Sequence, residues 1–307
     1  YGVYTMINHP FGRYGLTING TWKPNTDYSN PDVRAVLLKE TAQMAKDFKN
    51  TRGLLLYLLG NENNYGLFWD GAETEDIPEA NSRVKPRARA MYELFNEATV
   101  AMKEIIEDKP IALCNGDLLF LNIIAEECPD VDIYGTNMYR GKSFGNAFKK
   151  VKKVLNKPIL FTEFGSDAYN SIKNAEDQKM QAVFMVENWK EIYQNAAGLG
   201  KAENSIGGFT FQFSDGWWKF KQTADLKVHN TNASWGNGGY SLDFKKGTNN
   251  MNEEWFGICA KGKTNAEGFY TLKPRAAYYS LKEVHKINPY SDGITCKSVK
   301  KHFSKKK

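Results

Sequence analysis

Short apolar runs alternate along the chain with stretches in which apolar residues recur every three or four positions. Residues 54–59, Leu-Leu-Leu-Tyr-Leu-Leu, form an almost unbroken apolar run between two glycines. Such a run is typical of a strand buried on both faces, as in a parallel sheet covered by helices. Comparable runs predict further strands in residues 2–8, 109–114, 131–137, 157–163 and 206–213.

A helix is expected after each of these strands. The first begins at Asn30, a favoured N-cap residue, and has Pro31 at its first helical position, where a proline is well tolerated. Helical spacing of apolar residues also predicts helices in residues 92–106, 118–127, 148–155, 177–195 and 273–286. Strict alternation of six strand-plus-helix units predicts an α/β fold with a parallel sheet.

This alternation fits either a doubly wound sheet or a closed barrel. No predicted strand is followed by a glycine-rich phosphate loop, which disfavours a nucleotide-binding doubly wound fold. A chain of 307 residues is long enough to bury a sizeable core, and single α/β barrels commonly reach this size. We therefore expect one α/β domain.

Two glutamates stand where predicted strands end. Glu62 follows the run 54–59, and Glu163 ends the strand in residues 157–163. In parallel α/β proteins the active site lies at the carboxyl ends of the strands. A single glutamate at such a position is more often a solvated loop residue or a helix cap, but two of them on one sheet indicate a carboxylate pair.

Composition and charge change this interpretation little. Aromatic residues make up 13% of the chain, which suits a carbohydrate site but equally a large core. The net charge of +6 arises largely from a lysine-rich tail, residues 289–307. We expect this tail to be a solvated, frayed end or an artificial addition; the alternative is an arm that binds nucleic acid or an anionic surface.

No metal, cofactor or membrane span is predicted. The cysteines (Cys114, Cys128, Cys259, Cys296) show neither metal-ligand spacing nor a redox pair, and they leave the redox compartment undecided. The histidines and carboxylates show no ligand spacing either. No apolar run is long enough to cross a membrane, and no signal peptide is recognisable.

The motifs around the two glutamates resemble those of the clan A retaining glycoside hydrolases, most closely family 2, the β-galactosidase, β-glucuronidase and β-mannosidase group. Gly60-Asn61-Glu62 is similar to the end of that clan's fourth barrel strand, and Thr162-Glu163-Phe164-Gly165 to the end of its seventh. The segments 137–139, 212–218, 255–257 and 273–282 are also similar. The resemblance covers residues 1 to about 288, and it implies a (β/α)8 TIM barrel.

The resemblance also implies roles for individual residues. Glu62 would be the acid/base and Glu163 the nucleophile, while Asn61 would bind the sugar 2-hydroxyl and Tyr139 would contact the nucleophile. An aromatic platform for the sugar would come from Trp217 or Trp218.

Further candidates for substrate binding come from the residues themselves. The loop after the first strand carries two possible hydrogen-bonding groups, His9 and Arg13. Two tryptophans on predicted loops, Trp69 and Trp235, are candidates for outer sugar subsites. Asp215, a third carboxylate, is interpreted as a hydroxyl-binding or loop-capping group.

Counted against the family, the first strand of this chain is the third strand of the barrel. A barrel needs eight strands, and six would leave two open edges. We therefore expect residues 1–288 to be the carboxyl-terminal six βα units of a longer polypeptide, completed by an upstream segment.

The sequence thus predicts a retaining β-glycosidase that hydrolyses O-glycosyl bonds in oligo- or polysaccharides by double displacement at two glutamates. One alternative is a transglycosylase, resembling a glucanosyltransferase, that uses the same site. Another is a non-catalytic carbohydrate-binding barrel fragment. The expected partner is a carbohydrate rather than nucleic acid or a membrane, and a periplasmic or secreted location follows from the resemblance alone.

Overall fold

The computed structural model of the chain describes residues 2–67, 84–216 and 229–304. The chain forms two compact units: unit 1 consists of Tyr1–Asn137 and Lys149–Leu160, and unit 2 of Met138–Phe148 and Phe161–Lys307. Within these ranges, no helix combines the length and the apolar character needed to cross a membrane.

All six predicted strands are present and belong to one sheet. Its strand order is β1-β4-β5-β6-β7-β10, and each strand begins and ends within about four residues of the expected limits. The strands are β1 (Thr5–His9), β4 (Leu54–Leu59), β5 (Ile111–Gly116), β6 (Ile133–Asn137), β7 (Ile159–Phe164) and β10 (Ser205–Thr210). The predicted α/β class is therefore confirmed.

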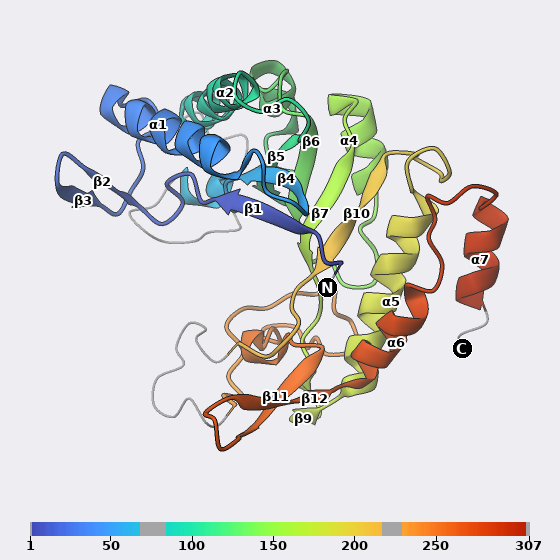
Figure 1. Cartoon of the computed structure of the whole chain (residues 1–307). Coiled ribbons are helices and arrows are strands. Elements are labelled where there is room, and N and C mark those ends of the chain that lie inside the picture. Colours follow the sequence, from blue (N-terminus) through green and yellow to red (C-terminus); the bar gives the residue numbers. More distant parts are fainter. Residues whose placement is uncertain (1, 68–83, 217–228, 305–307) are drawn as a thin grey trace. The chain divides into compact units, whose positions relative to one another are not determined.

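Unit 1 is built on parallel strands covered by helices. β1 pairs with β4, β4 with β5, and β5 with β6, all in parallel. Helix α2 packs between its two neighbours on one side of these strands (Figure 1). The helices are α1 (Pro31–Phe48), α2 (Val84–Lys103) and α3 (Leu121–Glu127), and α4 (Ala147–Leu155) begins in unit 2 and continues into unit 1.

The core of unit 1 explains why residues 54–59 read as a buried strand. The side chains of Leu56, Tyr57, Leu58 and Leu59 are at most 4% exposed. Between the first strand and α2, the ring of Phe11 stacks on that of Phe95 with centroids 4.3 Å apart. Phe11 belongs to the loop after β1, so this stack ties the loop to the helical layer.

Unit 2 contains β10 and most of β7. Helix α5 (Gln178–Gln194) packs against α6 (Ala276–Val284) and α7 (Cys296–Ser304). The tail expected to be frayed is therefore helical over α7, and that expectation is wrong for these residues. Its Val299 and Phe303 are buried, and Phe303 packs edge-to-face on Tyr193 of α5. These two apolar residues, four positions apart among lysines, form the face with which α7 packs against unit 2.

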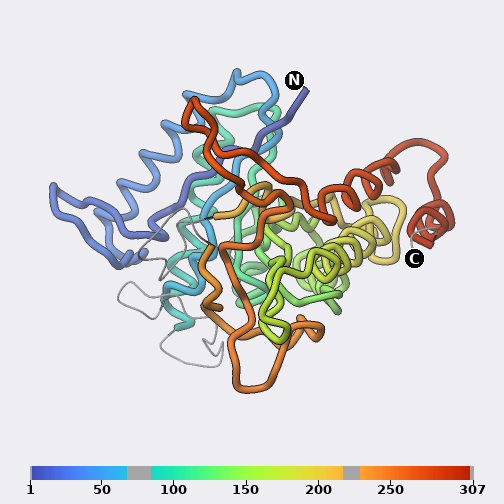
Figure 2. Tube along the Cα trace, turned by 90° about the horizontal axis from the view of Figure 1, so that it is seen from below, coloured from blue at the N-terminus to red at the C-terminus, as the bar shows by residue number. Residues whose placement is uncertain are grey.

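Several short elements were not predicted from the sequence, and the last of them along the chain occupies the first two residues of the helix expected in residues 273–286. An antiparallel hairpin, β11 (Cys259–Thr264) and β12 (Tyr270–Pro274), follows the long segment after β10 and leads into α6 (Figure 2). The others are a hairpin of β2 (Leu16–Ile18) and β3 (Thr21–Lys23), the pair β8 (Tyr169–Asn170) and β9 (Ala175–Glu176), and the 3-10 helices η1 (Asn63–Leu67) and η2 (Glu253–Trp255). They were missed because they are too short or too exposed for a clear apolar pattern.

The start of α1 provides a test of the local fold. The side chain of Asn30 accepts hydrogen bonds from the backbone N–H groups of Asp32 and Val33, as the N-cap prediction requires. We expect Asn30→Ala to lower the free energy of unfolding by about 1 kcal/mol, because it leaves these N–H groups without their acceptor. Asn30→Asp, which keeps the acceptor, should stay close to wild type in chemical denaturation. Equal destabilisation by both variants would contradict this role.

Candidate active site

The backbone around Glu62 is held in an unusual conformation at the end of β4. Gly60 has a φ of +83°, and a Cβ there would lie 2.6 Å from Asn63 Oδ1 and 2.7 Å from the Phe95 ring. Glu62 itself has a φ of +57°, a conformation that costs energy for any residue with a side chain. The Glu62 N–H donates to the carbonyl of Cys114, 3.1 Å away, which helps to stabilise the turn.

The side chain of Asn61 is oriented by groups from three other segments. Its Oδ1 accepts a hydrogen bond from Asn137 Nδ2 at 3.0 Å, and its Nδ2 donates to the Tyr14 hydroxyl at 2.8 Å. Cys114 Sγ also lies 3.7 Å from Asn61 Oδ1. Asn137 is 2% exposed, so the amide that orients Asn61 belongs to the core at the end of β6. Tyr14, Cys114 and Asn137 were not predicted as parts of the site.

The other two candidates in unit 1 make contacts within the fold. His9 Nδ1 accepts a hydrogen bond from the Phe11 N–H, and its Nε2 lies 3.3 Å from a carboxylate oxygen of Glu40. Burial lowers the pKa of His9, although Glu40 opposes the shift. Arg13 Nε donates to the carbonyl of Asn61 at 3.0 Å. Both residues thus fix the loop after β1, and their contacts to substrate stay predictions.

In unit 2, Glu163 lies near the end of β7 and accepts a hydrogen bond from Tyr139. The distance from the Tyr139 hydroxyl to Glu163 Oε2 is 3.0 Å. The backbone N–H of Met138 also donates to the Glu163 carbonyl at 2.9 Å. The expected contact between this tyrosine and this carboxylate is therefore present, and both side chains are partly buried.

The segment after β10 surrounds Tyr139. Asn237 Nδ2 donates to the Tyr139 carbonyl at 2.7 Å. The rings of Trp235 and Phe256 meet the Tyr139 ring edge-on, with centroids 6.3 and 5.7 Å away. Phe211 packs edge-on against Phe256. Sequence reasoning missed Asn237, Phe211 and Phe256, because nothing in an irregular segment indicates a partner about a hundred residues away.

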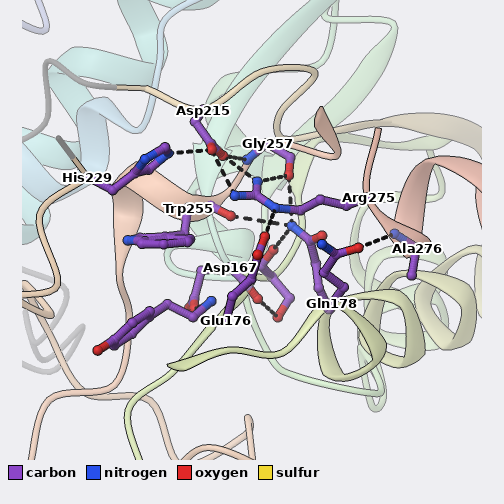
Figure 3. A network of polar contacts seen from close by, with 12 residues as sticks. Asp167, Glu176, Gln178, Asp215, His229, Trp255, Gly257, Arg275 and Ala276 are labelled. Carbon is purple, nitrogen blue, oxygen red and sulfur yellow. Dashed lines mark hydrogen bonds and ion pairs between the residues drawn. The ribbon is translucent and has the colours of Figure 1, made fainter. Parts of the chain in front are cut away.

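Asp215 forms a buried ion pair with Arg275. Two guanidinium nitrogens of Arg275, Nη1 and Nη2, lie 2.5 and 2.8 Å from the two carboxylate oxygens of Asp215. The side chain of Arg275 is 1% exposed, and that of Asp215 is 0% exposed. Figure 3 shows Asp215 between the Arg275 guanidinium and the imidazole of His229, whose Nε2 lies 2.6 Å from Asp215 Oδ2.

The same arginine joins further segments of unit 2. Its Nη1 donates to the carbonyl of Gly257 at 2.7 Å, and its Nε lies 2.7 Å from Glu176 Oε1. The Gly257 N–H in turn donates to Asp215 at 3.0 Å. Of the two roles that the sequence left open for Asp215, loop capping matches these contacts, and hydroxyl binding stays a prediction.

Two further buried acids anchor the loop after β7. Asp167 accepts a hydrogen bond from the backbone N–H of Tyr169, and Asp243 accepts one from that of Ser171. Burial raises the pKa of Asp243 to about 6. Burial, together with the negative charge of Asp243, raises the pKa of Asp167 well above its ordinary value. Neither acid was singled out from the sequence.

The remaining candidates, Trp69, Trp217 and Trp218, lie outside the described residues. In the part of the chain that is described, no group of three or more His, Cys, Asp or Glu side chains is arranged to hold a metal ion.

Comparison with solved structures supports the fold. A β-galactosidase from Marinomonas ef1 matches with a TM-score of 0.53 and 9% identity, over 97% of this chain and 52% of that protein. An agarase matches with a TM-score of 0.50 and 13% identity, over 84% and 41% of the two chains. A GH2 β-galacturonidase from Eisenbergiella tayi has a TM-score of 0.49 at 13% identity, over 85% and 38%.

This chain spans about half, or less, of the length of these proteins. At such low identity the likeness concerns the fold, and at that level it confirms the predicted resemblance to glycoside hydrolases. No model of a known protein family matches the chain, and comparison with curated protein sequences finds no match.

The buried ion pair leads to a stability prediction. Arg275→Met leaves Asp215 as a buried charge without its main partner, and we expect it to lower the free energy of unfolding by about 3–5 kcal/mol. The double variant Asp215→Asn/Arg275→Met should be more stable than Arg275→Met, because it leaves no unpaired charge. Glu176→Gln, at the partly exposed partner, should cost under about 1 kcal/mol. Equal midpoints of denaturant unfolding for all these variants would refute the role of the Asp215–Arg275 ion pair in stability.

Asp243 leads to a prediction about pH. Its folded pKa of about 6 lies above the ordinary value of 3.8, so the folded state binds the proton more tightly than the unfolded state does. The free energy of unfolding should therefore fall as pH rises from about 4 to about 6, by at most about 3 kcal/mol from this group. Asp243→Asn should flatten that decrease in thermal unfolding across this range. The exposed control Asp292→Asn should leave it unchanged. Because Asp167 also has a raised pKa and can contribute part of the slope, only a slope as steep in Asp243→Asn as in wild type would exclude Asp243 as a source.

Proposed function

We propose that the chain carries the catalytic residues of a retaining β-glycosidase that hydrolyses oligo- or polysaccharides. The observation that carries this proposal is the hydrogen bond from the Tyr139 hydroxyl to Glu163, a partly buried carboxylate near the carboxyl end of a sheet strand. Donation to a carboxylate oxygen stabilises the charged form, which is the form that acts as a nucleophile.

In the first step of the proposed reaction, Glu163 attacks the anomeric carbon and forms a glycosyl ester. The bond to the leaving-group oxygen breaks as Glu62 donates its proton to that oxygen. In the second step Glu62 takes a proton from water, and the resulting hydroxide attacks the anomeric carbon and releases Glu163. This mechanism requires the two carboxyl groups to come within about 5–5.5 Å of each other.

The roles of the two acids follow from their charges. Glu163 must be ionised to attack, and at the separation that the mechanism requires its negative charge would favour a proton on Glu62. Ester formation removes that charge, so Glu62 can then act as a base. The fixed backbone at Glu62 and the oriented amide of Asn61 support this assignment, because catalytic groups must be held in place before substrate binds.

Substrate contacts of the other candidates belong to the same proposal. We assign the sugar 2-hydroxyl to Asn61 and further hydroxyl contacts to His9, Arg13 and Asp215. Aromatic contacts are assigned to Trp69, Trp217 and Trp218. The six strands are proposed to be strands three to eight of a (β/α)8 barrel, and the location to be periplasmic or secreted, where polymeric substrates occur.

The proposal predicts the behaviour of two variants on a panel of aryl β-glycosides. Both Glu163→Gln and Glu62→Gln should lower turnover by about 10²–10⁴-fold or more, since each removes a group that acts in the transition state. Azide should restore turnover of activated substrates only in Glu62→Gln, because azide attacks the glycosyl ester without help from a base. In Glu163→Gln no ester forms, and the amide still occupies the space beside the anomeric carbon. Turnover of the panel is measured both for the chain alone and for the chain together with any segment that its gene encodes before Tyr1.

The matched control is Glu104→Gln, an identical change at an exposed glutamate beyond α2, which should turn over like wild type. Full activity in Glu163→Gln would show that the nucleophile is misassigned. Sugar binding without any turnover would favour the non-catalytic alternative, and lengthened products from one oligosaccharide would favour transglycosylation.

A further inference from the structure

Unit 1 contains a cavity of about 350 Å³ beside η1. The described part of its lining comprises residues 25–29, the end of η1 at Gly66 and Leu67, and the start of α2. The volume lies in the range of cavities that hold small molecules. None of the residues assigned to catalysis lines it.

Hydrogen bonds hold two of these segments together. The hydroxyl of Tyr28 donates to the carbonyl of Phe11 at 3.0 Å and accepts from Asn63 Nδ2 at 2.8 Å. Burial raises the pKa of Tyr28 to about 12, so this hydroxyl keeps its proton. Arg34 Nη1 donates to the carbonyls of Tyr28 and Ala90, at 3.3 and 3.4 Å, and so joins the loop to α2. The cavity is therefore formed before any ligand binds.

Hydrogen bonds through Asn63 link the wall of the cavity to the turn that carries Glu62. Asn63, whose amide nitrogen binds Tyr28, accepts a hydrogen bond from the Asn61 N–H at its Oδ1, 2.7 Å away. Gly66, which lines the cavity, follows Asn63 by three residues in η1, about 6 Å along a 3-10 helix, and Glu62 directly precedes this helix. A ligand longer than one sugar ring can span such a separation.

The lining combines an apolar surface with polar groups that match sugar hydroxyls. Leu67, Pro86 and Ala90 provide apolar contact. Asp27 is a carboxylate whose Oδ1 is used by Ser29, and Arg87 is a guanidinium whose Nη1 donates to the Leu67 carbonyl at 2.8 Å. The carboxylate accepts and the guanidinium donates, as vicinal hydroxyls require. Among the described lining residues, the one acid and the one base balance each other, which favours a neutral ligand.

We propose that this cavity binds a neutral sugar unit of an oligosaccharide, on the leaving-group side of the bond that Glu62 protonates. That placement rests on the proposed function, because the acid/base acts on the leaving-group oxygen. The cavity then gives the enzyme a preference for oligosaccharides over substrates with a single sugar, since a remote unit contributes binding energy that a short substrate lacks.

The proposal can be tested by a substitution that fills the cavity. Ala90→Phe places a large side chain in it while the Ala90 carbonyl keeps its bond to Arg34. The control is Val100→Phe, at a position on α2 that is 42% exposed and does not line the cavity. Activity is measured as kcat/KM for an aryl monoglycoside and for β-linked oligosaccharides that end in the same sugar. We expect Ala90→Phe to lower the oligosaccharide-to-monoglycoside ratio about tenfold, and Val100→Phe to leave it unchanged. An equal ratio in all three proteins overturns the proposal.

A binding measurement separates this proposal from the proposed function. The same oligosaccharides are titrated into wild type, Ala90→Phe and Asp27→Asn by calorimetry, with thermal unfolding as a check on folding. Weaker binding in both variants supports the cavity as a sugar site even if no glycoside is turned over. Turnover of glycosides with equal oligosaccharide binding in all proteins, or no binding to wild type, refutes the cavity site and leaves the catalytic assignment to its own test.

Discussion

Polar groups at the carboxyl ends of parallel strands must find hydrogen-bond partners, and in this chain they find them in one another. At the ends of β4 and β6, Asn61 pairs with Asn137 at 3.0 Å. Beyond β4, the Asn64 side chain both donates to and accepts from the backbone of Gly116 at the end of β5. Because an unpaired buried amide costs about 1–3 kcal/mol, these hydrogen bonds favour a single conformation of the loops. The side chains around Glu62 depend on them.

In unit 2 a charged side chain, that of Arg275, provides hydrogen-bond partners for the polar groups. Arg275 neutralises the buried negative charge of Asp215 and also donates a hydrogen bond to the carbonyl of Gly257. Gly257 follows Phe256, whose ring packs against Tyr139. Asn237 fixes the backbone of Tyr139 from the same long segment. The hydroxyl that reaches Glu163 is thus positioned by residues that follow it by about a hundred positions. A segment without regular structure can hold a site in this way because its polar groups bond to specific partners.

Strands such as β5 and β6 were predictable because all of their residues are buried, so that their sequences are largely apolar. The start of α1 was predictable because an N-cap acts through its own neighbours in the chain. By contrast, the exposed strands β11 and β12 carry no such pattern, and α7 was obscured by its lysines. The contacts of Tyr139 with Glu163 and of Asp215 with Arg275 span 24 and 60 residues. The first was expected only through the family resemblance, and nothing in the sequence indicated the second.

The most direct test of the catalytic assignment is to trap the proposed glycosyl ester. The protein, with any segment that its gene encodes before Tyr1, is incubated with a panel of dinitrophenyl 2-deoxy-2-fluoro-β-glycosides, whose fluorine slows the breakdown of an ester once it forms. Intact mass and peptide mapping then identify the labelled residue. We expect the mass increase of one fluorosugar, located on Glu163 and absent from Glu163→Gln. A label on another carboxylate, in an enzyme that turns over the parent glycoside, would contradict the catalytic assignment.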